Sequence, residues 1–250
     1  MPRSQSPNQR RSNASRARWL AAYRRAARDS IYSLIILVPL VIGFELAAAW
    51  LRPIGAPSPR LIAPGAIRDL FGWLGASGAW LPAITMCGVL IGMQLSRATA
   101  SKPRAAVALL SIAEGAALAL PLALVSVALL GRGSAADVAG ITAYRAVLAI
   151  GAALYEEFVF RLVLISALLF LFRDLMRLKQ SGAAALSVAV AATVFSAAHF
   201  PPAGSMAFGW PEFFFYVSAG AYLSVLFLAR GLPIAVVCHA AYNIAMLIWR

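Results

Sequence analysis

Ionisable and hydrogen-bonding side chains occur inside the apolar runs of this 250-residue chain. A charged side chain at the centre of a bilayer costs about 2.5–3.5 kcal/mol on insertion scales, so we expect such residues to have a function. The residues concerned are Glu156, Glu157, Arg161, His199, His239 and Asn243. They include the only two histidines of the chain.

The adjacent residues Glu156 and Glu157 face different directions on a helix, so they can have different partners. Positions four apart share a helix face, so Glu157 and Arg161 can pair and neutralise each other. Glu156 is rotated by about 100° from Glu157, and the same arginine cannot easily serve both carboxylates. One acid is then left facing elsewhere in a low dielectric, which suits a general base or acid. The alternative is a buried polar network that only fixes helix packing.

The remaining candidates lie further along the chain. His199 is at a predicted helix end, where a lone histidine is more often structural than catalytic. His239 and Asn243 lie four apart, so both can donate hydrogen bonds towards one point, as an oxyanion requires. An interhelical hydrogen-bond pair would show the same spacing. Taken together, the acid, the histidine and the His/Asn pair supply a base, its partner and an oxyanion site.

Transmembrane helices are the elements that must hold these residues. Hydrophobic residues make up 62% of the chain and charged residues 12%, against about 45–50% and about 25% in soluble domains. We therefore predict an all-α fold, a polytopic membrane helix bundle of about seven transmembrane helices that encloses a polar cavity. A crossing needs about 20 apolar residues. The predicted spans are residues 31–51, 80–95, 105–130, 143–172, 183–200, 213–229 and 232–249.

The basic residues predict how the chain is organised and oriented. The net charge is +13, and the arginines flank the apolar runs, as the positive-inside rule and anionic lipid headgroups would require. This placement argues against a nucleic-acid partner. Residues 1–30 are predicted to be a basic cytoplasmic tail, in which 15–27 form an interfacial helix. An uncleaved anchor is favoured over a signal peptide. Residues 31–140 are predicted to be N-terminal membrane helices, and 141–250 a catalytic core in the cytoplasmic membrane.

Three motifs appear in order on separate predicted helices: EExxxR, FxxxH (Phe195 and His199) and HxxxN. This set, over roughly residues 145–248, resembles the CPBP family of intramembrane endopeptidases, which includes the type II CAAX prenyl endopeptidase and bacteriocin-processing and abortive-infection homologues. The resemblance implies an all-helical bundle around a hydrophilic cavity. It implies that Glu156 and His199 activate a water molecule, that His239 and Asn243 hold the oxyanion, and that Glu157 and Arg161 support the site.

Several alternatives remain open at this stage. Glu156, His199 and His239 also form a His₂Glu set of the kind that holds catalytic zinc, although no HExxH motif is present. The resemblance favours metal-free hydrolysis with no cofactor. A non-catalytic membrane scaffold and a proton-coupled transporter are the other function classes. The expected partners of a peptidase are the lipid bilayer and a membrane-tethered or lipid-modified protein: a prenylated protein, a leader peptide or a C-terminal sorting helix.

The predicted topology separates the two histidines. His199 lies at the outer end of its span, whereas His239 is only about seven residues, roughly 10 Å, from the cytoplasmic end of its own. They can meet if residues 201–211 dip into the bundle, where irregular backbone must line a cavity. We therefore predict such a dip.

Glu114, a GxxxG motif and an aromatic run are predicted to have structural roles. Glu114 is expected to pair with Arg145 or to line the cavity. Gly88 and Gly92 form a GxxxG motif that predicts a helix-packing contact. The aromatic run 213–216 is expected to face lipid or the core.

Overall fold

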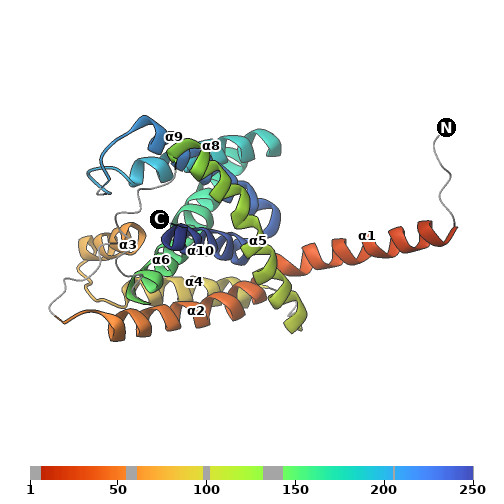
Figure 1. The fold of residues 1–250 in the computed structure, drawn as a ribbon, viewed down its shortest axis with the longest axis horizontal. Helices are drawn as coiled ribbons and strands as arrows, with labels where there is room; N and C mark the ends of the chain where they lie inside the picture. The colour runs from red at the N-terminus through yellow and green to blue at the C-terminus, as the bar shows by residue number, and fades with distance from the viewer. Residues whose placement is uncertain (1–6, 55–60, 98–101, 132–142, 205, 250) are drawn as a thin grey trace.

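All regular secondary structure in the described residues is helical. The structure is a computed structural model that describes residues 7–54, 61–97, 102–131, 143–204 and 206–249 (Figure 1). Within these ranges every regular element is helical, which confirms the predicted all-α class. The helices are α1 (Pro7–Ala27), α2 (Ser30–Leu51), α3 (Ile62–Trp73), α4 (Leu81–Leu95), α5 (Ala105–Leu130), α6 (Ala143–Glu156), α8 (Gln180–Ala198), α9 (Trp210–Arg230) and α10 (Leu232–Trp249).

Four of the described helices, α2, α5, α8 and α9, are long and apolar enough to cross a membrane. Helix α4 and residues Leu232–Ile248 of α10 are apolar but shorter. The predicted span 143–172 is one continuous helical rod made of α6, the π-helical segment η2 (Glu157–Ile165), α7 (Ser166–Leu169) and the π-helical segment η3 (Phe170–Leu175). The chain is an integral membrane protein, and helices cover the seven ranges predicted as spans.

The π-helical segment η2 begins directly after Glu156. Its hydrogen bonds run from residue i to i+5 and widen the helix, a departure that occurs frequently at functional sites. Glu157 and Arg161 lie in this segment and are buried. The sequence prediction assumed a regular α-helix here, and the structure corrects that assumption.

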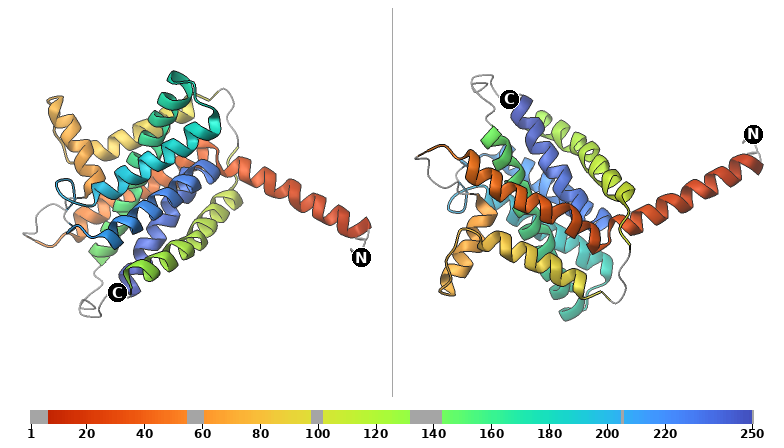
Figure 2. Two further views of the ribbon diagram at one scale, coloured as in Figure 1. Left: turned by 90° about the horizontal axis from the view of Figure 1, so that it is seen from above. Right: turned by 90° about the horizontal axis from the view of Figure 1, so that it is seen from below.

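Helix ends are set by recognisable residues. The Asp29 carboxylate accepts a hydrogen bond from the backbone N–H of Ile31, at 3.2 Å, and so caps α2. Helix α9 ends at Gly231, whose φ of 94° lies in the left-handed region that glycine adopts without penalty. This turn redirects the chain, and α10 leaves α9 to lie along α5 and α6 (Figure 2).

Small residues allow the closest helix contacts. A Cβ atom on Gly115 of α5 would lie 2.8 Å from Val237 Cβ of α10, and one on Gly220 of α9 would lie 2.9 Å from Ala192 Cα of α8. In contrast, nothing lies within 4 Å of a Cβ on Gly88 or Gly92. The predicted packing contact at the GxxxG motif is therefore wrong, because within the described residues this face of α4 meets no neighbour.

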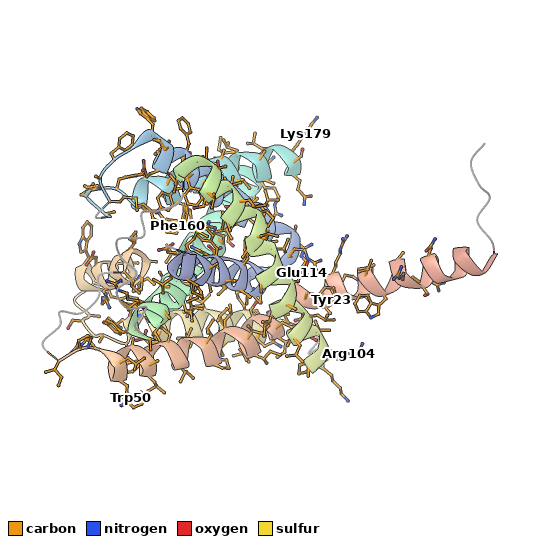
Figure 3. The ribbon with its side chains drawn as sticks, in the orientation of Figure 1. Tyr23, Trp50, Arg104, Glu114, Phe160 and Lys179 are labelled. Atoms are coloured by element: carbon orange, nitrogen blue, oxygen red, sulfur yellow. The ribbon has the colours of Figure 1, made fainter. Side chains whose placement is uncertain are left out.

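Helix α1 extends away from the bundle (Figure 1) and contains the helix predicted at 15–27. It is fixed at its C-terminal end, where Tyr23 donates a hydrogen bond to Glu114 Oε2 at 2.7 Å and the two labelled residues lie next to each other (Figure 3). Burial and this hydrogen bond raise the pKa of Tyr23, which keeps the phenol protonated as a donor. The interfacial position of α1 stays a prediction, and residues 1–6 of the predicted tail lie outside the described residues.

Glu114 has a different partner from the one expected. Arg230, at the end of α9, binds both of its carboxylate oxygens, with 2.7 Å between Arg230 Nε and Glu114 Oε1. The predicted pairing of Glu114 with Arg145 is wrong because this face of α5 points towards α1 and the end of α9.

Candidate active site

One cavity of about 360 Å³ lies between α5, α6, α8, α9 and α10. Four of the predicted site residues line it: Glu156, His199, His239 and Asn243. These residues come from three helical segments and are up to 87 positions apart in the sequence. The structure thus brings the acid, both imidazoles and the amide to one cavity.

The other two predicted residues lie behind the cavity wall. Glu157 and Arg161 are fully buried and are absent from the cavity lining. Arg161 Nε lies 3.2 Å from Glu157 Oε2, the ion pair expected from their spacing. The guanidinium also stacks over the ring of Phe195, 4.2 Å from its centre, a favourable cation–π contact. Phe195 of the FxxxH motif therefore packs against the charge pair.

His239 is held by the same carboxylate. Its Nδ1 lies 2.8 Å from Glu157 Oε1. A carboxylate only accepts hydrogen bonds, so Nδ1 carries the hydrogen and Nε2 is left for the cavity. Nε2 lies 3.9 Å from Glu156 Oε2. One acid of the pair thus orients the imidazole and the other faces it across the cavity.

Glu156 is the acid that reaches the cavity. Its residue is only 6% exposed, yet it belongs to the cavity lining, in contrast to its neighbour Glu157. The arginine and His239 Nδ1 are both engaged by Glu157. The carboxylate of Glu156 is therefore the one placed to exchange a proton with a molecule in the cavity.

His199 is positioned by two contacts at the end of α8. Its Nδ1 lies 2.8 Å from the carbonyl oxygen of Phe195, which again places the hydrogen on Nδ1 and a lone pair on Nε2 of the neutral ring. The ring stacks on Tyr216 of α9, with 3.9 Å between centres and 18° between planes. Both contacts restrict the rotation of the imidazole.

Asn243 lies on the cavity wall next to α6. Its Nδ2 donates a hydrogen bond to the carbonyl oxygen of Ala149 at 3.0 Å. An amide nitrogen carries two hydrogens, so one remains to be donated elsewhere. His239 and Asn243 line the same cavity from successive turns of α10, as their four-residue spacing requires.

The histidines meet without the predicted dip of residues 201–211. Pro201, Pro202 and residues 206–208 are exposed, so this segment does not enter the bundle. Instead, the chain turns at Gly231 between α9 and α10, and His239 of α10 lies beside Phe195 near the C-terminal end of α8. Phe195 contacts both imidazoles, with ring centres 4.8 Å from His199 and 6.1 Å from His239.

The cavity lining also includes Tyr216 and Arg145, which the sequence did not predict as site residues. Tyr216 was placed in an aromatic run expected to face lipid or the core, yet it lines the cavity beside His199. The sequence predicts Arg145 as a partner for Glu114, yet it lines the cavity on α6. Its position four residues before Ala149 and eleven before Glu156, on one helix face, is the signal that could have indicated this.

Among the residues that the structure describes, no group of three or more histidine, cysteine, aspartate or glutamate side chains has the arrangement of a metal site. His199 in particular directs Nδ1 to a backbone carbonyl.

The fold and the cavity define an integral membrane protein in which ionisable and hydrogen-bonding side chains gather inside a helical bundle. The family model described as "Type II CAAX prenyl endopeptidase Rce1-like" matches residues 139–245. This match confirms the family resemblance predicted from the three motifs and supports CAAX-type intramembrane endopeptidase activity in general terms. No curated protein and no solved structure matches the chain.

Proposed function

We propose that this protein hydrolyses a peptide bond near the end of a membrane-tethered or lipid-modified protein, using water activated by Glu156 and His199 and no metal ion. The family match supports a membrane-associated protein as the substrate. The observation that carries the proposal is that Glu156, His199, His239 and Asn243 line a single cavity although they come from three helical segments.

The charges around the cavity are consistent with this chemistry. Glu157 and Arg161 form a neutral pair out of reach of the cavity. Glu156 and His239 form an acid–imidazole pair that faces it, with 3.9 Å between Oε2 and Nε2. In the proposed reaction Glu156 accepts a proton, whereas His239 Nε2–H donates a hydrogen bond.

The reaction follows from these roles. A water molecule hydrogen-bonded to His199 Nε2 attacks the scissile carbonyl carbon while Glu156 takes its proton. The carbonyl oxygen becomes an oxyanion, which accepts hydrogen bonds from His239 Nε2 and Asn243 Nδ2. The C–N bond then breaks as the proton held by Glu156 is transferred to the leaving amine. The products are a new carboxylate and a new amine.

The decisive variant is Glu156→Gln, which preserves the size of the side chain and removes its ability to accept a proton. We expect it to abolish cleavage while the protein still inserts and remains monodisperse in detergent. The readout is a comparison of membrane-protein termini from cells that produce the wild type or the variant. Glu212→Gln is the matched control, because Glu212 is a glutamate outside the cavity lining.

Each result of this comparison bears on the function class. New termini that depend on Glu156 support the peptidase. Identical termini in both strains would contradict it and would leave a scaffold. Loss of proton-coupled transport in place of cleavage would indicate a transporter.

We further propose that the protein resides in the cytoplasmic membrane with its N-terminus in the cytoplasm. The basic helix α1 and the basic loops after α4 and η3 support this orientation.

A further inference from the structure

A second cavity, of about 180 Å³, lies at the end of the bundle away from α1, where the end of α2, helix α3 and the start of α4 meet (Figure 1). Arg52, which directly follows α2, is part of its lining. Arg68 of α3 shares a helix face with Pro64, four positions before it, and both line the cavity. Among the described residues of the lining, these two guanidinium groups face one carboxylate, that of Glu45.

The carboxylate of Glu45 already has a partner on α6. Its Oε1 accepts a hydrogen bond from the hydroxyl of Tyr155 at 2.5 Å. Phe44, beside it in the chain, packs edge to face on the ring of Tyr155, with 5.8 Å between centres. The two arginines outnumber this one acid, and the planar fork of a guanidinium matches the oxygens of a phosphate or a carboxylate. An anion is therefore the ligand that fits the cavity.

The cavity lies at the level of the lipid headgroups. Arg52 follows the last residue of α2, which is long and apolar enough to cross a membrane. Trp50, Trp73 and Trp80, at the ends of the three surrounding helices, are each at least half exposed, and tryptophan is enriched at membrane–water interfaces. With the N-terminus in the cytoplasm, as proposed above, this is the outer end of the bundle, where the positive-inside rule does not call for arginines.

An apolar groove adjoins the cavity and runs between α2 and α4. It shares Glu45 and Trp80 with the cavity. Its remaining lining is apolar and consists of Val41, Ile42, Leu46, Ala83, Ile84 and Cys87. Ile42 and Ile84 are more than half exposed, so the groove opens on the outside of the bundle. Ile42 lies ten residues before Arg52, about 15 Å along a helix, which is half of a hydrocarbon core of about 30 Å.

A cationic cavity at headgroup level, joined to an apolar groove one leaflet deep, matches an amphiphile with an anionic head. We propose that this site binds an anionic phospholipid, with the phosphate on Arg52 and Arg68 and one acyl chain in the groove between α2 and α4. Two guanidinium groups favour a lipid with a net negative charge over a choline lipid, because the choline headgroup carries its own cation. The site shares no described lining residue with the cavity of Glu156, so the inference does not depend on the proposed peptidase function.

The test uses the full-length protein in phosphatidylcholine vesicles that contain a trace of phosphatidylglycerol with a photoreactive group on one acyl chain. After irradiation and proteolysis, mass spectrometry should find the cross-links within residues 41–46 and 83–87, which contain the groove lining. Arg52→Gln and Arg68→Gln are each expected to lower this labelling about fivefold, the effect of one basic residue near a membrane surface. Arg68→Lys should retain most of it. Labelling that lies outside these two segments, or that neither glutamine variant lowers, would overturn the proposal.

Arg104→Gln is the matched control. Arg104 is exposed and lies at the opposite end of α2, where its backbone N–H donates a hydrogen bond to the hydroxyl of Tyr32 at 3.0 Å. This variant should be labelled as the wild type is. A loss equal to that of Arg68→Gln would overturn the proposal, because the probe would then respond only to the overall charge of the protein.

Two further probes define the ligand. A photoreactive phosphatidylcholine with the same chains should label the groove at least about fivefold less than the glycerol lipid, and equal labelling would refute the preference for an anionic lipid. Inorganic phosphate, added at an ionic strength matched with chloride, should leave the labelling unchanged because it has no acyl chain. Displacement of the lipid probe by phosphate under these conditions would assign the cavity to a soluble anion and overturn the proposal.

Discussion

Glu157 Oε1 lies 2.8 Å from His239 Nδ1, although the two residues are 82 positions apart in the sequence. The same carboxylate also faces Arg161, with 3.2 Å between Oε2 and Nε. Glu157 therefore orients an imidazole of the cavity and balances a buried guanidinium. Its neighbour Glu156 lines the cavity instead, so the two adjacent glutamates have different surroundings.

Replacement of these two acids should separate stability from activity. Glu157→Gln leaves the buried Arg161 without a countercharge, and breaking a buried ion pair costs about 3–5 kcal/mol. Glu156→Gln should change stability by less than about 1 kcal/mol, because its carboxylate faces the cavity. Thermal unfolding of both variants in detergent, together with a cleavage assay, measures the contrast. Equal destabilisation by the two substitutions would contradict the division of roles.

Tyr216 should act as a positioning residue for His199. The stacked ring, with 3.9 Å between centres, restricts the imidazole, and such contacts contribute about 0.5–1.5 kcal/mol. Tyr216→Leu is therefore expected to lower kcat by up to about tenfold, whereas Tyr216→Phe keeps most of the activity. Phe214→Leu, on an exposed ring of the same helix, serves as the control. A fall in kcat in the Phe variant as large as in the Leu variant would argue against the stacking role.

Asn243 should contribute mainly to the transition state. Removal of one oxyanion donor typically lowers kcat by about 10²–10³-fold, and we expect this for Asn243→Ala with little change in KM. Steady-state kinetics on a cleaved peptide provide the measurement. An increase in KM at unchanged kcat would place Asn243 in ground-state binding instead.

Glu114 should hold α1 on the bundle and have no part in catalysis. It accepts hydrogen bonds from Tyr23 of α1 and from Arg230 of α9. Glu114→Gln weakens both bonds, so trypsin should cut after Arg24 and Arg25 about tenfold faster. Mass spectrometry of the early fragments measures this rate, with Glu212→Gln as the control. Protection equal to that of the wild type would show that other contacts hold α1.

Local sequence patterns predict much of this architecture. Apolar runs of span length predict the helices, because a lipid environment requires all backbone hydrogen bonds to be made within a segment. Polar residues within those runs identify Glu156, His199, His239 and Asn243 as candidates, because their burial in lipid is costly. The ion pair of Glu157 and Arg161 follows from four-residue spacing alone.

Only the tertiary structure decided how these residues meet. The sequence predicted a dip at 201–211 and a partnership of Glu114 with Arg145, and both were wrong, because they depend on how α10 turns at Gly231 and which way α5 faces. The contact of Glu157 with His239 and the stacking of Tyr216 on His199 join separate helices. Residue spacing determines which side chains share a face of one helix, whereas the packing of several helices determines which faces enclose a cavity.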